Sequence, residues 1–135
     1  MIDNFVRAAT VARVVDGDTF TADVDLGFYV RVRMSCRLVG LNAPEHNEPG
    51  GPEARTALAT LLGKGEVTVA SVRADKFAGR FDAEVTVTGP PADGGRPAWH
   101  VNAWMIQQGY AVAWDGTGPK PRVPWPPKQQ EVPAS

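Results

Sequence analysis

Residues 10–38 read TVARVVDGDTFTADVDLGFYVRVRMSCRL, and apolar and polar side chains alternate along most of this stretch. A period of two is typical of strands that have one buried and one polar face. The pattern predicts three consecutive strands, at 10–15, 19–26 and 30–41. The turn Asp16-Gly17-Asp18 joins the first two, and an Asp-Gly pair in that place predicts a tight hairpin in which the glycine takes a positive φ.

The hydrophobic period then changes to that of a helix. Its apolar stripe consists of Ala54, Ala57, Leu58, Leu61 and Leu62. Pro52 suits the first turn of this helix, and Gly63 suits its C-terminal end. Two further strands, 66–73 and 81–87, and a second short helix, 102–108, complete the predicted elements.

The predicted order is three strands, a helix, two strands and a helix. It matches a mainly β (α+β) fold, a five-stranded Greek-key OB-fold barrel with two short helices. An unspecified α+β domain has the same strand count, so the count alone does not separate the two. We expect the barrel to span residues 1–115 and residues 116–135 to form an extended or disordered tail, because six of the twelve prolines lie in 119–133. Trp125 in this tail either packs back on the barrel or stays free.

Length and composition exclude several classes of function. A chain of 135 residues suits one domain, with a monomer as the default. The formal net charge of -1 excludes a globally cationic nucleic-acid coat but not a local basic patch. A single cysteine, Cys36, excludes an intramolecular disulfide.

No apolar run approaches the ~20 residues that span a bilayer, and the first ten residues lack the features of a signal peptide. We therefore expect no membrane association and a cytoplasmic protein.

Several polar residues lie at the predicted strand ends. If the barrel brings the third strand beside the first hairpin, Asp18, Asn42 and Glu45 converge into an all-oxygen cluster that suits a hard cation such as Ca²⁺. Arg37 would stand close by, and Arg80 ends another turn. Together these groups would make a phosphodiester site, although the Asp-Gly-Asp turn taken alone is an ordinary solvated hairpin.

Arg31 and Arg33 on the third strand are open to two interpretations. They either extend a phosphate-binding surface or pair with Asp23 and Asp25 across the sheet.

Five segments in order carry a resemblance to a known family. They are VVDGDTF (14–20), RLVGLNAPE (37–45), GPEARTALATLL (51–62), DKFAGR (75–80) and VNAWMIQQGYA (101–111). The chain resembles the staphylococcal nuclease (thermonuclease) family. The resemblance implies an OB-type barrel and a calcium-dependent endonuclease that cleaves DNA and RNA and leaves 5′-hydroxyl and 3′-phosphate ends.

The resemblance also implies a metal site for one Ca²⁺ ion. Asp18 matches a calcium-ligand aspartate, and Ala43 matches a residue that binds the ion through its backbone carbonyl. Asn42 stands where the family has a second ligand aspartate, and Asp16 matches an acid that supports the site. Because Asn42 removes one negative charge, we expect Ca²⁺ to bind more weakly than in the family archetype.

The remaining correspondences concern catalysis. Glu45 matches the general base, and Arg37 and Arg80 match the two arginines that bind phosphate and stabilise the transition state. Lys76 and Phe77 in the turn before Arg80 are weaker candidates for substrate contacts.

This sequence also departs from the family pattern. Ala78 is an extra residue in the turn before Arg80, and the Pro-rich tail replaces the family's C-terminal helix. The alternative is a catalytically weak or inactive OB-fold module that binds single-stranded nucleic acid or a protein partner. Asn42 and the near-zero net charge favour this alternative, whereas both arginines together with Glu45 disfavour it.

Overall fold

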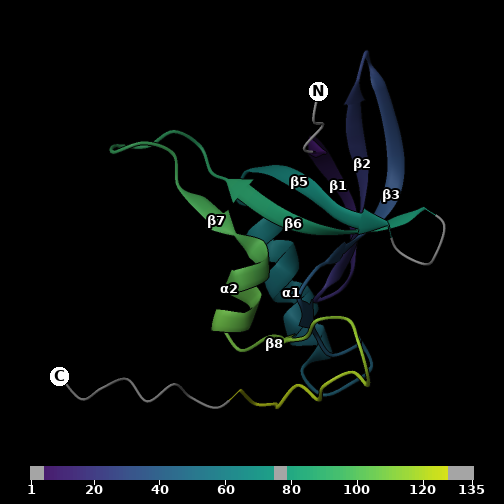
Figure 1. Cartoon of the computed structure of the whole chain (residues 1–135). Helices are drawn as coiled ribbons and strands as arrows, with labels where there is room; N and C mark the ends of the chain where they lie inside the picture. Colours follow the sequence, from purple (N-terminus) through teal and green to yellow (C-terminus); the bar gives the residue numbers. More distant parts are fainter. Residues whose placement is uncertain (1–4, 75–78, 128–135) are drawn as a thin grey trace.

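A computed structural model describes residues 5–74 and 79–127 (Figure 1). The elements, in chain order, are β1 (Val6–Asp16), β2 (Thr19–Gly27), β3 (Val30–Leu38), β4 (Leu41–Asn42), α1 (Gly51–Leu62), β5 (Glu66–Ala74), β6 (Arg80–Thr88), β7 (Ala98–His100), α2 (Val101–Gln107) and β8 (Val112–Ala113). In this part of the chain, no helix is long and apolar enough to cross a bilayer.

Five of the strands close into a barrel. The main sheet runs in the order β3-β2-β1-β5-β6-β7 with antiparallel neighbours, and β3 also pairs with β6 in parallel. This pairing sets Ser35 opposite Arg80 and Arg37 opposite Asp82, and it joins the two ends of the five-stranded sheet. The predicted OB-type barrel is therefore confirmed, with β7 as a short extension beyond the closure.

The interior is filled mainly by the apolar faces that the strand and helix periods of the sequence predict. Alternate residues of β2 point inward, as do the stripes of α1 and α2. In β3 only the last three residues are buried, and Val30 and Val32 at its start are exposed. The largest fully buried side chains are Phe20, Leu38, Leu41, Leu58, Leu61, Met105, Val69, Val85, Val87, Val101 and Cys36. Each large apolar side chain buried in this way contributes about 1.5–3 kcal/mol, so the core holds the barrel and both helices together.

The β1–β2 hairpin is tight, as expected, with Asp16 paired with Thr19. The predicted positive φ at Gly17 is wrong, since Gly17 is not among the positive-φ residues of the chain. A Cβ at this position would lie 2.6 Å from the Cβ of Ala54 and 3.1 Å from that of Ala43. Glycine is required here because the turn presses against α1 and the loop after β4.

The predicted strand 30–41 is broken rather than continuous. Gly40 has a φ of 86°, which ends β3 and turns the chain into the separate strand β4. β4 pairs with β8, which follows α2. The sequence did not indicate β7 or β8, because two or three residues are too few to show an alternating pattern.

The chain after β8 runs back across the lower end of the barrel (Figure 1). Residues 116–127 contain no helix or strand. Trp125 is half-buried, and its ring stacks on Tyr110 with 6.2 Å between the ring centroids. Of the two alternatives for Trp125, packing against the barrel is therefore the observed one. The division at residue 115 stays a prediction, and residues 128–135 lie outside the described part.

Candidate functional site

Asp18 ties the β1–β2 hairpin to the loop that follows β4. Its Oδ2 atom accepts a hydrogen bond of 3.0 Å from the backbone N–H of Ala43, and its Oδ1 atom accepts one of 2.9 Å from the Thr19 hydroxyl. The Leu38 N–H donates to the Asp18 carbonyl over 2.8 Å. Two regions that are far apart in sequence therefore meet at one carboxylate.

Arg37 lies beside this carboxylate at the end of β3. Its Nη2 atom is 3.7 Å from Asp18 Oδ2 and donates to the Leu41 carbonyl over 3.2 Å. The ring of Trp114 covers the guanidinium, with 5.3 Å from Cζ to the ring centroid. The side chain is consequently held on several sides and is only 8% exposed.

Asn42 is also buried, and it is connected to the C-terminal part of the chain. Its Nδ2 atom donates a hydrogen bond of 3.1 Å to the Pro121 carbonyl. A carbonyl partner requires the amide nitrogen, so the Asn42 Oδ1 atom is the one that can serve as a ligand. An aspartate at this position could not make this bond.

Asp16 and Glu45 have different surroundings from Asp18. Asp16 Oδ1 accepts a hydrogen bond of 2.9 Å from the backbone N–H of His46 and lies 3.3 Å from His46 Nδ1. Glu45 is exposed, and its backbone N–H donates to Glu48 Oε1 over 2.8 Å. Asp16 thus supports the loop that carries Glu45, and the Glu45 side chain is open to water.

Arg80 opens β6 and is half-buried. It lies opposite Ser35 in the parallel β3–β6 pairing, in which Arg37 lies two positions further along β3. Because successive side chains point to opposite faces, Arg37 and Arg80 share the face opposite Cys36 and Phe81. The turn that contains Lys76, Phe77 and Ala78 lies outside the described residues.

Asp82 is a buried carboxylate that the sequence analysis missed. It lies opposite Arg37 on β6, is 5% exposed, and its Oδ2 atom accepts a hydrogen bond of 2.7 Å from Arg73 Nε. The spacing of two residues from Arg80 was a usable signal, because it places both side chains on one face of the strand.

The buried thiol of Cys36 is unsuited to nucleophilic chemistry. Burial, with a smaller contribution from the charge of Asp82, raises its pKa to about 12. The thiol therefore stays protonated at neutral pH.

Arg33 pairs with Asp23 across β2 and β3. Arg33 Nε lies 3.0 Å from Asp23 Oδ1, and the hydrogen bond lowers the pKa of that carboxyl. Arg31 stands opposite Asp25 in the same register. For Arg33, pairing across the sheet is therefore the observed alternative.

Asp18, Asn42 and Ala43, the residues that the resemblance assigns to a metal, carry oxygen atoms of the kind that hard cations bind. Asp18 supplies a carboxylate, Asn42 an amide oxygen and Ala43 a backbone carbonyl. Within the described ranges, no group of three or more His, Cys, Asp or Glu residues could hold a metal ion. These residue types suit a hard cation, and one of the three side chains, that of Asp18, is a carboxylate.

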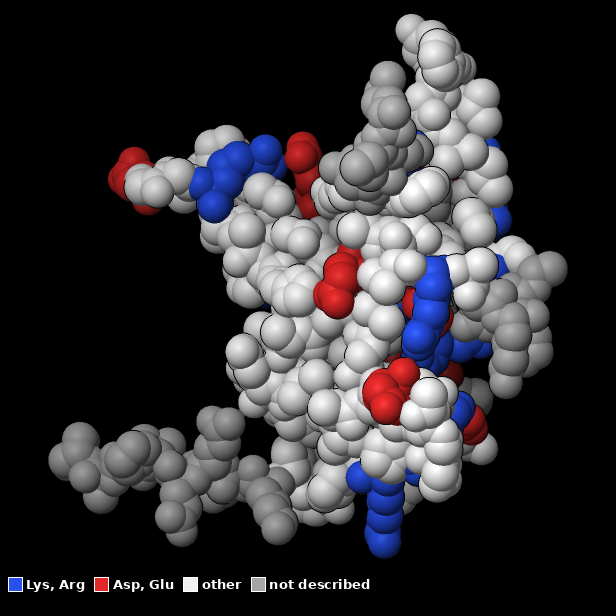
Figure 2. Space-filling model, in the orientation of Figure 1, with Lys and Arg blue, Asp and Glu red and all other residues white. Residues whose placement is uncertain are grey.

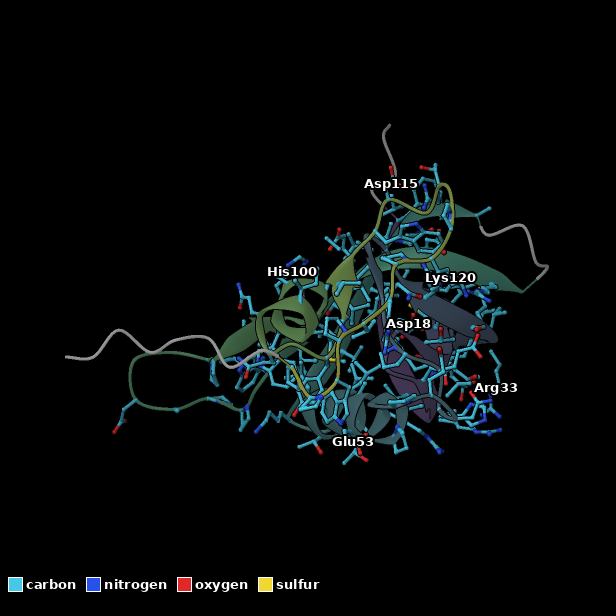
Figure 3. All side chains as sticks on the ribbon, turned by 90° about the horizontal axis from the view of Figure 1, so that it is seen from below. Asp18, Arg33, Glu53, His100, Asp115 and Lys120 are labelled. Carbon is cyan, nitrogen blue, oxygen red and sulfur yellow. The ribbon has the colours of Figure 1, made fainter. Side chains whose placement is uncertain are left out.

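A pocket of about 380 Å³ is lined by Asn42, Ala43 and Glu45, whereas Asp18 and Arg37 are not among its lining residues. On one side it is lined by Asn42, Ala43, Pro44, Glu45, Glu48 and Pro49, and on the other by Lys120, Pro121, Arg122, Val123 and Trp125. Figure 3 views this end of the barrel from below, with the segment that carries Asp115 and Lys120 crossing in front of it. On the face drawn in Figure 2, acidic and basic side chains gather together along the right side, and a second mixed group lies at the upper left.

Comparisons with known proteins agree with this architecture. The family model described as "Staphylococcal nuclease homologue" matches residues 35–123, which is more than half of the chain. A protein named "Micrococcal nuclease" from Shigella flexneri is 33% identical over 104 residues, which cover 77% of this chain and 56% of that protein. "Protein ParB" from Escherichia coli is 35% identical over 104 residues, covering 77% of this chain and 55% of that protein. The chain spans about half the length of these relatives.

Proposed function

Because the chain belongs to the staphylococcal nuclease family, we propose that it hydrolyses phosphodiester bonds of DNA, RNA or both. The observation that carries this proposal is the convergence of Asp18, Arg37 and Ala43 at one end of the barrel. The proposal includes calcium dependence, endonucleolytic cleavage, and products with 5′-hydroxyl and 3′-phosphate ends.

The first part of the mechanism is the binding of the substrate phosphate. Asp18, Asn42 Oδ1 and the Ala43 carbonyl would hold one Ca²⁺ ion, which when bound supplies positive charge to a phosphate oxygen. Arg37 and Arg80, on one face of the β3–β6 pair, add guanidinium groups that match phosphate geometry. These groups stabilise the negative charge that builds up on the phosphoryl oxygens.

The second part is proton transfer to Glu45. Glu45 accepts a proton from a water molecule as the water oxygen forms a bond to phosphorus, and the bond from phosphorus to the 5′-oxygen breaks. The leaving oxygen takes up a proton to become the 5′-hydroxyl, and the phosphate stays on the 3′ side. The exposed position of Glu45 supports this role because the carboxylate is in contact with solvent.

One observation favours a second candidate, a non-catalytic module that binds single strands. The oxygen donors around Asp18 include one carboxylate, and no described group of three or more acidic, His or Cys residues could hold a metal. A weak metal site would leave the barrel able to bind nucleic acid without cleaving it.

Plasmid digestion separates the two candidates. The wild-type protein is incubated with plasmid in Ca²⁺, in Mg²⁺ and in chelator. Degradation in Ca²⁺ that chelator abolishes supports the nuclease. A gel shift without degradation in any of the three conditions supports the binding module and contradicts the nuclease.

A further inference from the structure

We propose that the C-terminal segment, residues 114–125, forms a wall of the nucleic-acid site, where Lys120 and Arg122 bind substrate phosphates. This inference rests on the proposed function and extends it to residues outside the five segments that carry the resemblance. The site residues identified above by resemblance all lie at or before Arg80, and this segment lines one pocket together with three of them, Asn42, Ala43 and Glu45.

The segment is attached to the barrel at several points. The Trp114 N–H donates to the Gly40 carbonyl over 2.9 Å, and the Pro121 carbonyl accepts from Asn42 over 3.1 Å. Val123 is buried, and Trp125 stacks on Tyr110. Lys120 and Arg122 therefore lie on a segment that is fixed on both sides of them, rather than on a free tail.

The two cations face the loop that carries the proposed base. Lys120 and Arg122 line the same pocket of about 380 Å³ as Asn42 and Glu45. Both are exposed, and within residues 5–74 and 79–127 no ion pair joins either of them to a carboxylate. Their charges are therefore available to a ligand in the pocket.

The charges that line this pocket balance, with two carboxylates on the loop and two cations on the C-terminal segment. The loop contributes two carboxylates, those of Glu45 and Glu48, which would repel a phosphate if they acted alone. Lys120 and Arg122 offset both charges. Arg37 does not line this pocket, so in the proposed scheme it serves the reacting phosphate, and Lys120 and Arg122 serve other phosphates of the strand.

The test measures binding of a fluorescein-labelled single-stranded oligonucleotide of about a dozen nucleotides, a length within the range of OB-fold sites. Anisotropy is recorded in chelator over a series of salt concentrations for the wild type and for Lys120→Ala/Arg122→Ala. The matched control, Lys64→Ala/Arg96→Ala, removes the same charges elsewhere, because Lys64 lies over Trp99 and Arg96 pairs with Glu66. Cleavage in Ca²⁺ provides KM and kcat.

We expect the Kd of Lys120→Ala/Arg122→Ala to rise about tenfold or more, and the slope of log Kd against log salt to fall by about 1.4, or about 0.7 for each phosphate contact. KM should rise with kcat within about twofold, since neither residue touches the reacting atoms in this scheme. Lys120→Arg/Arg122→Lys should restore binding. Circular dichroism checks that all variants are folded.

Two other results separate a failure of this inference from a failure of the proposed function. If the wild type cleaves and binds, but Lys120→Ala/Arg122→Ala binds as well as the control variant, the inference is overturned and the proposed function stands. If the wild type neither binds nor cleaves, the proposed function fails and the inference fails with it.

Discussion

At the scale of single residues, Glu45 and Arg37 represent opposite cases. The side chain of Glu45 is exposed and has its proposed role in chemistry, whereas the side chain of Arg37 is buried and bonded to its surroundings. Substitutions of the two should therefore separate catalysis from stability.

Glu45→Gln keeps the shape of the side chain and removes its ability to accept a proton. We expect kcat to fall about 10²–10⁴-fold, which is the usual contribution of a general base. The midpoint of urea unfolding should stay unchanged, because the side chain is exposed. Full activity of this variant would remove Glu45 from the mechanism.

Arg37→Ala should reduce stability as well as activity. It deletes the hydrogen bond to the Leu41 carbonyl and leaves Asp18 without its neighbouring guanidinium. We expect a loss of about 1–3 kcal/mol in the free energy of unfolding, measured with urea. Arg33→Ala is a suitable comparison, because its ion pair with Asp23 is exposed and should contribute far less. Equal stability of the two variants would contradict this account.

Asn42→Asp tests two consequences of one substitution. A second carboxylate beside Asp18 should tighten Ca²⁺ binding, which calorimetric titration measures directly. The same change removes the donor to the Pro121 carbonyl, so the metal-free protein should lose about 0.5–1.5 kcal/mol of stability. Equal Ca²⁺ affinities of wild type and variant would contradict the first expectation, and equal stabilities in chelator the second.

At the scale of elements, the β1–β2 hairpin positions the site because it packs against α1. A methyl group at Gly17 would lie too close to Ala54 Cβ, at 2.6 Å, and would push the turn away from the helix. Asp18 is the next residue in that turn, so a shift of the turn also displaces its bond to Ala43.

Gly17→Ala should therefore destabilise the fold by about 1–3 kcal/mol, the usual effect of overpacking. Gly27→Ala in the next turn provides a comparison, since a Cβ there meets nothing within 4 Å and the effect comes from its φ of 84° alone. Urea unfolding measures both. Binding of Ca²⁺ should weaken in Gly17→Ala and stay unchanged in Gly27→Ala; an unaltered Ca²⁺ affinity in Gly17→Ala would contradict the coupling of this turn to the site.

At the scale of the whole molecule, the barrel could be predicted because its strands and α1 carry clear periods. The alternating pattern of β2 and the apolar stripe of α1 each describe one buried face. The break at Gly40 could not be predicted in the same way, since it depends on how β4 pairs with β8 far along the chain.

The candidate site was only partly predictable from sequence. Motif resemblance identified Asp18 and Arg37, and the structure brings these two together. The sequence motifs gave no signal for the bond between Asn42 and Pro121, because 79 residues separate the two and the acceptor is a backbone carbonyl. Glu45, Asn42 and Pro121 all line one pocket, which joins parts of the chain that are far apart in sequence and is therefore visible only in three dimensions.

The most direct test of the account is the chemistry of the cut ends. An end-labelled oligonucleotide is incubated with the wild-type protein in Ca²⁺, and the products are compared before and after phosphatase treatment. We expect cleavage that leaves a 3′-phosphate and a 5′-hydroxyl. Products with 5′-phosphate ends, or an oligonucleotide that stays intact in Ca²⁺, would contradict it.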